Sequence, residues 1–341
     1  MESNWLVSVI IPVYNVRPFL EEALDSVLNQ SYANLEILVI DDGSTDGSGE
    51  TCDAYAKRDG RVRVIHQENR GLSAARNAGL DAMTGDVVAF LDSDDAFDPD
   101  FVEEMLSAMI RESADVVVCR FTMHQTAGRL SCKGNERPHP SIAPGRYDRT
   151  EAIRSQVKGA INISVWNKLF RRALWNGIRF PEGHVFEDIE VTLQILEQCD
   201  SVFMIDRPLY KYRQRSGSIM NNYTMPAVID DWITARTHFI SFVEARTPGL
   251  FSGDDLAAAG TIMINGMTTH YIRYCREAKR DAYAEGLRQR IIAQARAVGV
   301  ERLGFSTRIG HCMLCACPRL LQLVYPVYRA VRMCIYRIIG R

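Results

Sequence analysis

The chain has 341 residues, of which 47% are hydrophobic and 24% charged, and its formal net charge is −2. This composition is typical of a soluble globular protein, and the length predicts one large domain plus a smaller region. The nearly neutral charge gives no indication of nucleic-acid binding. The first residues form a strand-like run and lack the pattern of a signal peptide, which predicts a cytosolic protein with reduced cysteines.

The N-terminal part of the chain alternates between strand-like and helix-like patterns. Short β-rich runs cover residues 7–12, 35–40, 62–67, 86–91 and 115–119. Apolar residues at helical spacing cover residues 19–28, and helices are also expected over residues 49–58 and 73–83. This order is typical of parallel βαβ units. It predicts an α/β fold with a Rossmann-like, mostly parallel sheet flanked by helices.

The rest of the chain has a different pattern. Residues 128–146 are rich in Gly, Pro, Ser and charge, which predicts a mobile connection. The helical period returns after Ile189, and little strand signal remains from Met225 to the end. We therefore predict a first domain over residues 1–222, with halves at about 1–120 and 147–222, and a helical C-terminal region over 223–341.

Three acidic clusters follow apolar, strand-like runs. They are Asp41-Asp42, Asp92-Ser93-Asp94-Asp95 and Glu187-Asp188. Open α/β sheets bind ligands beyond the carboxyl ends of their strands, and Mg²⁺ or Mn²⁺ prefers carboxylate and phosphate oxygens. The clusters therefore predict a metal and diphosphate site, although Asp and Ser are also frequent in ordinary turns.

Several segments together resemble one enzyme family. VSVIIPVYN, ILVIDDGSTDGS, NRGLSAARNAGL and VVAFLDSDD, in this order, are similar to the nucleotide-binding half of the family-two glycosyltransferases, whose catalytic domain has the GT-A fold. The likeness continues through WNKLFRR, FPEGHVFED and PLYKYRQRSGSI, and so covers roughly residues 5–220. It implies inverting transfer of a sugar from a nucleotide diphosphate donor, with a UDP-sugar expected. The implied acceptor is a hydroxyl of a glycan or lipid-linked glycan, in bacterial polysaccharide or cell-envelope synthesis.

The resemblance assigns nucleotide contacts to the ends of the first two predicted strands. It implies that Asp42 accepts a hydrogen bond from the uracil imide N–H, which suits a carboxylate. It also implies that Tyr14 packs near the base and that Pro12 and Val13 supply backbone contacts. The alternative for Tyr14 is a surface aromatic side chain that covers a strand end.

Basic residues are expected near the diphosphate. Arg76 lies in the first turns of a predicted helix, where the resemblance places it beside the nucleotide and where it could neutralise phosphate charge. Its alternative is an ordinary helix-surface arginine. The segment YKYRQRSGSI places Tyr212, Arg213 and Arg215 around a glycine, which predicts a loop that closes over the diphosphate.

Asp92-Ser93-Asp94 matches the Asp-x-Asp motif of the GT-A fold. Mn²⁺ or Mg²⁺ bound there would stabilise the charge that develops on the leaving diphosphate. Alternate residues of an extended segment face the same way, so Asp92 and Asp94 are expected to converge. We predict Asp94 as a direct metal ligand and Asp92 as a contact to the ribose or to a metal-bound water. Ser93 is placed among the nucleotide-sugar contacts, and Asp95 is expected to orient hydroxyls of the donor sugar.

The acceptor hydroxyl must lose a proton as it attacks, and a nearby carboxylate can receive that proton. The resemblance implies Asp188 as the general base, with Glu187 positioning it or binding the acceptor. The alternative is that these acids only favour a helix N-terminus, since a helix is expected from Ile189. Trp166 and Lys168, in the WNKL segment, are implied acceptor contacts, and core packing is the alternative for Trp166.

The C-terminal segment is cationic and amphipathic. No apolar run approaches the roughly 18 residues of a membrane-spanning helix, and no Asp or Glu follows Arg302. Within residues 318–341, one helical arc holds Arg319, Gln322, Arg329, Arg332 and Arg337. This pattern predicts peripheral binding to the inner face of the cell membrane, and a helix docked on the protein is the alternative.

Two other functions remain as alternatives. An inactive module that binds nucleotide-sugars or polysaccharides would be expected to lack Asp94 or Asp188, and both are present. A sugar-nucleotide pyrophosphorylase would need a glycine-rich loop near its N-terminus, and VSVIIPVYNVRP contains no glycine.

Overall fold

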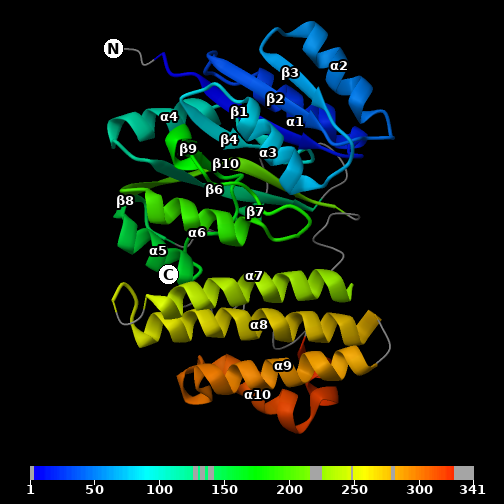
Figure 1. The fold of residues 1–341 in the computed structure, drawn as a ribbon, viewed down its shortest axis with the longest axis vertical. Coiled ribbons are helices and arrows are strands. Elements are labelled where there is room, and N and C mark those ends of the chain that lie inside the picture. The colour runs from blue at the N-terminus through cyan, green and yellow to red at the C-terminus, as the bar shows by residue number, and fades with distance from the viewer. Residues whose placement is uncertain are drawn as a thin grey trace. The chain divides into compact units, whose positions relative to one another are not determined.

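The computed structural model describes residues 4–125, 130, 135–136, 142–215, 225–246, 249–277 and 281–325. Internal contacts divide the chain into two units, Met1–Ser216 and Gly217–Arg341. The predicted boundary at residue 222 lies outside the described residues. The first unit is an α/β domain, and the described part of the second is helical (Figure 1).

The first unit begins with alternating strands and helices. In chain order these are β1 (Val7–Val13), α1 (Arg17–Leu28), β2 (Leu35–Asp41), α2 (Ser48–Arg58), β3 (Val62–His66), α3 (Leu72–Ala82), β4 (Val87–Phe90), β5 (Ala96–Phe97) and α4 (Phe101–Arg111). Its second half contains β6 (Val116–Gln125), β7 (Asn135–Glu136), β8 (Gly145–Asp148), α5 (Arg149–Val157), β9 (Lys168–Arg171), the 3₁₀ helix η1 (Arg172–Trp175), α6 (Asp188–Gln198) and β10 (Ser201–Gln214).

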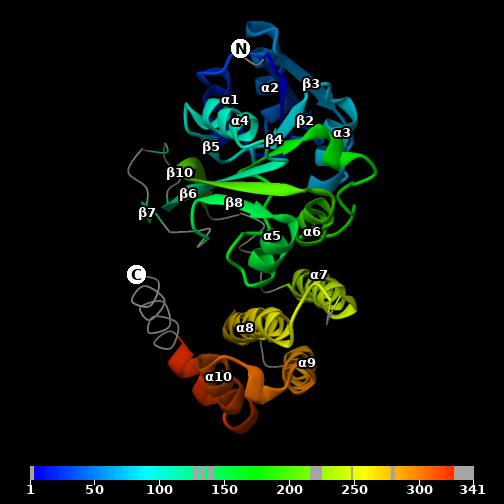
Figure 2. The ribbon, with the colours of Figure 1, turned by 90° about the vertical axis from the view of Figure 1, so that its left-hand side faces the viewer.

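One mixed sheet organises this unit. Its strand order is β3-β2-β1-β4-β9-β6-β10-β5, with β7 added to β6 and β8 to β10. Strands β1 to β4 pair in parallel, whereas β9 is antiparallel to both of its neighbours. Helices α1, α2 and α4 cover one face, and α3 and α6 cover the other (Figure 2). The predicted α/β fold with a helical C-terminal region is confirmed.

The packing of α3 requires a glycine. A Cβ atom on Gly79 would lie 2.4 Å from Cγ2 of Ile10, on β1. Because such a contact is far inside van der Waals range, only glycine lets α3 approach the sheet this closely. Strand β1 itself is buried along its whole length, and Val13, its last residue, lies opposite Asp41 at the end of β2. The α3 helix and the carboxyl ends of β1, β2 and β4 therefore surround one region of the domain.

The structure differs from the sequence predictions in three places. The first residues of the segment predicted as a loop over the diphosphate form the end of β10, so Tyr212 and Arg213 lie on a strand. Most of the predicted mobile connection at 128–146 lies outside the described residues, although β7 and the start of β8 fall inside it. The segment after β4 is not extended, because the N–H of Asp95 donates to the carbonyl of Asp92 at 2.9 Å and closes a turn. We call residues 92–95 the acidic turn.

The second unit consists of helices and short connections. They are α7 (Pro226–Ala245), α8 (Gly253–Glu277), α9 (Ala282–Val298), the 3₁₀ helix η3 (Val300–Arg302) and α10 (Phe305–Ala316), and residues 318–325 are also helical. Helix α8 packs against both α7 and α9, and α10 contacts α8 and α9. Residues 326–341, which hold most of the predicted cationic segment, lie outside the described residues.

Candidate functional site

Asp42 organises the loop that follows β3. Its carboxylate accepts hydrogen bonds from the backbone N–H groups of Arg70, at 2.9 Å, and Gly71, at 2.8 Å. The side-chain amide of Gln67 adds a third bond at 2.7 Å, and the N–H of Asp42 donates to the carbonyl of Val13. Asp42 is 3% exposed. The structure thus places Asp42 just after β2 and beside the end of β1, and its contact with uracil stays a prediction.

The neighbouring residues differ in exposure. Val13 is buried and Pro12 lies in the same buried strand, whereas the Tyr14 side chain is 48% exposed. Tyr14 is therefore accessible to a flat ligand such as a base, which is what its predicted role requires.

His66 was missed by the sequence analysis. Its Nδ1 lies 2.8 Å from Oδ2 of Asp41, and its Nε2 lies 3.1 Å from Oδ1 of Asp53. These two carboxylates raise the pKa of His66. Asp41 also accepts a hydrogen bond from the N–H of Ser44 at 3.0 Å, so it orients the loop after β2. His66, Asp41 and Asp53 come together only in the folded protein, and their spacing in the sequence does not indicate these contacts.

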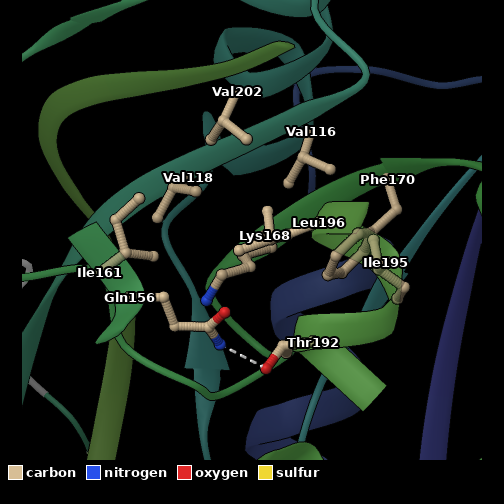
Figure 3. A pocket seen from close by; sticks show the side chains of 10 residues that line it. All are labelled: Val116, Val118, Gln156, Ile161, Lys168, Phe170, Thr192, Ile195, Leu196 and Val202. Carbon is tan, nitrogen blue, oxygen red and sulfur yellow. Dashed lines mark hydrogen bonds between the residues drawn. The ribbon is translucent and has the colours of Figure 1, made fainter. Parts of the chain in front are cut away.

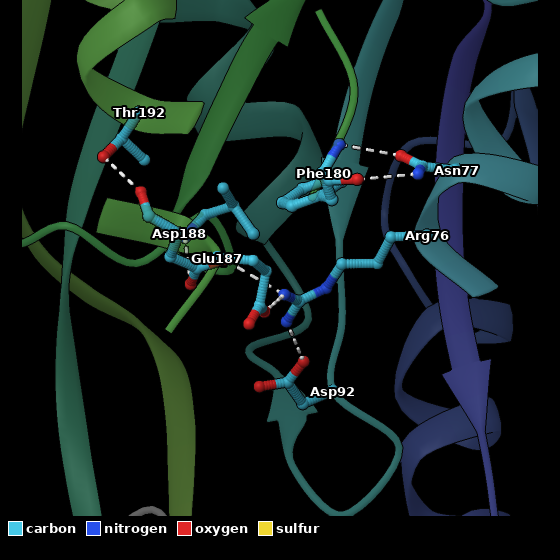
Figure 4. A network of polar contacts seen from close by, with 8 residues as sticks. Arg76, Asn77, Asp92, Phe180, Glu187, Asp188 and Thr192 are labelled. Carbon is cyan, nitrogen blue, oxygen red and sulfur yellow. Dashed lines mark hydrogen bonds and ion pairs between the residues drawn. The ribbon is translucent and has the colours of Figure 1, made fainter. Parts of the chain in front are cut away.

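Arg76 lies at the centre of a carboxylate network formed with Asp92, Glu187 and Asp188 (Figure 4). Its Nη2 is 2.9 Å from Oδ1 of Asp92, and its Nη1 is 3.0 Å from Oδ1 of Asp188 and also contacts Glu187. The guanidinium group is buried and lies over the Phe180 ring. Its role against a diphosphate stays a prediction, because the contacts shown here are all with carboxylates and an aromatic ring.

Burial and charge act in opposite directions on this network. Burial alone would lower the pKa of Arg76, but the charges of Asp188, Asp92 and Glu187 outweigh it and raise that pKa. Burial raises the pKa of Asp188 to about 7, against the opposing charge of Arg76. A carboxylate with a pKa near neutrality can exchange a proton at physiological pH, which suits a general base.

The segment before α6 presents Asp188 to the network. Phe186 has a φ of 67°, in the left-handed region of the backbone. This conformation costs about 1–2 kcal/mol for a residue other than glycine. The carbonyl of Asp188 accepts a bond from the Thr192 hydroxyl at 2.6 Å, and Oδ2 of Asp188 lies 3.3 Å from the N–H of Val165. Asp188 is the first residue of α6, one residue before the predicted helix start. The strand predicted before Glu187-Asp188 is absent, because residues 181–187 form a loop, and the role of Asp188 as base stays a prediction.

Asn77 holds the same segment against α3. Its side-chain amide donates to the carbonyl of Phe180 at 2.9 Å and accepts from the N–H of Phe180 at 2.8 Å. Both residues are buried. This reciprocal pair fixes the backbone that leads to Glu187 and Asp188.

Replacing Asn77 with alanine is expected to lower the free energy of unfolding by about 2 kcal/mol, because a buried N–H and a buried carbonyl lose their partners. Urea denaturation measures this change. Asn34→Ala is the matched control, since its amide bonds to Asn4 lie in an exposed position, and it should change stability by less than about 0.5 kcal/mol. Equal losses in the two variants would contradict the role of Asn77.

The acidic turn is bound to β10 at several points. Asp95 is 1% exposed, and its carboxylate accepts from the Tyr210 hydroxyl at 2.6 Å and from the N–H of Arg213 at 2.7 Å. Nε of Arg213 donates to the carbonyl of Asp94, and Nε of Arg215 lies 2.7 Å from Oδ2 of Asp94. The two contacts found for Asp95 are structural, and its predicted contact with the donor sugar stays a prediction.

Asp92 and Asp94 have the chemistry of a divalent-cation site. Both carboxylates are partly exposed, and burial together with the charge of Asp92 raises the pKa of Asp94. Such unfavourable crowding of negative charge is relieved by a cation. Within the described residues no three His, Cys, Asp or Glu side chains form a complete metal cage. Mg²⁺ and Mn²⁺ commonly need only one or two carboxylates plus substrate phosphate, so this pair fits such an ion.

Ser93 and Arg213 are buried, whereas Arg215 is only partly so. Arg213 also pairs with Glu22 on α1 at 2.5 Å, and the guanidinium groups of Arg213 and Arg215 both lie over the ring of Phe19. These contacts connect the end of β10 to α1. The residues immediately after Arg215 lie outside the described part of the chain.

Trp166 and Lys168 lie in the interior. The Trp166 ring packs against Phe121, Tyr210 and Tyr212, and Lys168 Nζ donates to oxygens of Asn162, Ser164 and Asn167. Burial lowers the pKa of Lys168 to about 7. Contact of either residue with an acceptor stays a prediction, and their burial favours the packing alternative.

A small cavity adjoins Lys168 (Figure 3). Most of its lining residues are aliphatic, and Gln156 donates a 2.6 Å hydrogen bond to the Thr192 hydroxyl at its edge. That hydroxyl in turn donates to the carbonyl of Asp188. The cavity is therefore connected to Asp188 through the Thr192 hydroxyl. Its apolar lining does not fit a nucleotide.

Comparisons with known proteins agree with this arrangement. Residues 8–177 match Glycosyl transferase family 2. The glycosyltransferase GlyA of Streptococcus pneumoniae is 36% identical over 66% of this chain and 33% of its own length, so the chain spans only a third of that relative. GlyG of the same organism is 33% identical over 63% of this chain and 73% of its own length.

The fold has a close counterpart among solved structures. A crystal structure of S. aureus TarS 1–349 in complex with UDP-GlcNAc superposes with a TM-score of 0.66 and 20% identity, covering 94% of this chain and 91% of that one. At this level of identity the likeness shows the GT-A fold. Together with the sequence matches, it establishes that the chain belongs to glycosyl transferase family 2.

Proposed function

We propose that this protein is an inverting, metal-dependent glycosyltransferase that moves a sugar from a nucleotide diphosphate donor, with UDP-sugar the expected class, to an acceptor hydroxyl. The observation that carries the proposal is the carboxylate network, in which Arg76 joins Asp92 of the acidic turn to Asp188 at the start of α6. Transfer requires a donor-binding group and a proton acceptor close together, and one arginine contacts both.

Each side chain has a proposed task. Asp188, whose pKa is about 7, removes the proton of the acceptor hydroxyl as the hydroxyl attacks the anomeric carbon. Glu187 shares the positive charge of Arg76 and so helps to hold Asp188 in place. Asp92 and Asp94 would hold Mn²⁺ or Mg²⁺, which when bound stabilises the negative charge of the leaving diphosphate.

The nucleotide contacts are proposed at the ends of β1 and β2. Asp42 and the exposed Tyr14 would contact the base, and the TarS structure supports a uridine nucleotide because it contains UDP-GlcNAc. Pro12 and Val13 would contribute through their backbone.

The proposed acceptor is a glycan or lipid-linked glycan in polysaccharide or cell-envelope synthesis, and the proposed location is the cytoplasmic face of the membrane. None of the helices in the described part of the chain is long and apolar enough to cross a bilayer. Peripheral attachment through residues 318–341 is therefore proposed. In the described part of this segment, Leu320 and Leu323 are exposed, whereas Gln322, predicted on the polar arc, is buried.

A thermal-shift screen of nucleotide sugars tests the donor class. A ligand at about 100 times its Kd stabilises the native state by about 2.7 kcal/mol, so the matching UDP-sugar should raise the melting temperature by several degrees. The shift should require Mn²⁺ or Mg²⁺ and disappear with EDTA. GDP-sugars serve as the control for the base. A shift that is equal for all nucleotides, or unaffected by EDTA, would contradict the proposed donor site.

A turnover assay with the donor so identified separates an enzyme from an inactive binding module. The enzyme should release UDP, at least slowly to water, whereas a binding module would show the thermal shift without UDP release.

A further inference from the structure

Helix α10 has a buried side and, opposite it, an exposed side that is mostly apolar. Its inward side packs through Thr307, Gly310, His311 and Leu314, which are buried. Its outward side carries Phe305, Ile309, Cys312 and Ala316, all of which are exposed. At about 100° per residue these four fall within an arc of about 60°. We call them the outer face of α10.

The outer face is unusual for a surface helix. Phe305 is 73% exposed and Ile309 40% exposed, and the following residues Leu320 and Leu323 are 49% and 76% exposed. A helix that borders water normally has polar residues on its outward side, yet Arg308 is the only charged residue in α10. Exposed apolar side chains that recur over residues 305–323 indicate a surface that contacts something other than water.

The charged residues near the outer face of α10 indicate what kind of surface it contacts. Arg302, Arg308 and Arg319 are exposed, and no Asp or Glu follows Glu301 in the sequence. The stretch from Arg302 to Arg319 thus exposes apolar side chains and three arginines and contains no acidic residue. Such a stretch is complementary to an anionic lipid bilayer, where apolar groups enter the interface and basic groups contact the headgroups.

We propose that the outer face of α10, together with Leu320 and Leu323, inserts into the interface of an anionic membrane. This inference rests on the peripheral attachment proposed above and gives it a second, apolar component on a folded helix. Apolar insertion is insensitive to salt, whereas attraction of the arginines is screened over about 8 Å at physiological ionic strength. The attachment should therefore survive, in weakened form, at high salt.

Vesicle flotation of the full-length protein, with a reductant present, tests the proposal. Phe305→Ser combined with Ile309→Ser should lower partitioning onto phosphatidylglycerol-containing vesicles by about 30-fold, because two apolar side chains no longer enter the interface. The matched control is Ile110→Ser with Met225→Ser, two exposed apolar residues elsewhere that are 37% and 53% exposed. The control should bind within about twofold of the unsubstituted protein. Arg308→Gln with Arg319→Gln should reduce binding to anionic vesicles only.

A second measurement guards against misfolded variants. Phe305→Trp should preserve vesicle binding, and brominated lipid should quench its fluorescence more strongly than that of the unsubstituted protein. Lack of added quenching would overturn the proposal.

Three outcomes of flotation would also overturn it. These are equal binding by the Phe305/Ile309 variant and its control, loss of binding only when residues 326–341 are deleted, and a change in oligomeric mass of the Phe305/Ile309 variant with no change in vesicle binding. The last outcome would assign the outer face to a second copy of the chain. Donor hydrolysis without vesicles should be unchanged in the face variants. Its complete absence in the unsubstituted protein would reject the proposed enzyme while leaving the flotation result decisive for α10.

Discussion

Replacing Asp188 with asparagine is expected to lower kcat by about 1,000-fold while leaving donor binding nearly unchanged. The amide is almost isosteric with the carboxylate and can keep a bond with Val165, but it cannot take the proton of the acceptor hydroxyl. Turnover is measured as UDP release with acceptor present, and donor binding by calorimetry.

Glu190→Gln is the matched control for the charge at the helix N-terminus. Glu190 is the other acidic residue in the first turn of α6, so its loss reproduces the change in helix-end electrostatics without removing the base. Its turnover should fall less than about threefold. Similar losses of turnover in the two variants would mean that Asp188 acts only through the charge at the helix N-terminus.

The pH dependence of the unsubstituted enzyme follows from the same group. The base acts when it is ionised, and the pKa of Asp188 is about 7. Below that pH the ionised fraction falls about tenfold per unit, so kcat/KM should decline with the same slope and level off above pH 7. Asp188→Asn should remove this limb of the profile.

Replacing Asp94 with asparagine is expected to abolish metal-dependent donor binding and to lower kcat/KM by about 100-fold or more. The substitution removes one of two carboxylates of the proposed cation site and the ion pair between Asp94 and Arg215. Calorimetric titration of UDP with and without Mn²⁺ measures the binding component.

The matched control for Asp94 is Asp98→Asn. Asp98 follows the acidic turn closely and has a similar side-chain exposure, at 26% against 19%, but it faces Lys211. The Asp98→Asn variant should keep metal-dependent binding of UDP. Undiminished turnover of the unsubstituted enzyme in EDTA would reject the metal role of Asp94 irrespective of either variant.

The early strands and helices were predictable because their patterns are local. Strand β1 is buried on both faces and reads as a continuous apolar run, and α3 follows from spacing within one helix. Two of the three acidic clusters could be placed at strand ends for the same reason, since Asp41-Asp42 ends β2 and Asp92 follows β4. The prediction was wrong for Glu187-Asp188, which follows a loop at the start of α6. Ion pairs of Arg76 with Asp92, Glu187 and Asp188 bring the second and third clusters together.

The missed features depend on distant partners. Strand β10 contains Asp206, Arg207 and Pro208, which weaken any strand pattern, and its pairing with β6 has irregular register at this point. Arg76 was expected beside a phosphate, and an arginine in isolation gives no indication of the three carboxylates around it. For Asp95, the sequence pattern gave no indication of the two hydrogen bonds that its carboxylate accepts from β10, and its contact with the donor sugar stays a prediction. For Arg76 and Asp95 these are contacts across more than a hundred residues.

The double attachment of Asp95 has a practical consequence for enzyme engineering. The Tyr210 hydroxyl and the Arg213 side chain both hold the acidic turn, so replacing either side chain is expected to loosen the turn that carries Asp92 and Asp94, although the N–H of Arg213 would still bond Asp95. Libraries that randomise β10 to alter acceptor choice would then lose donor affinity as a side effect.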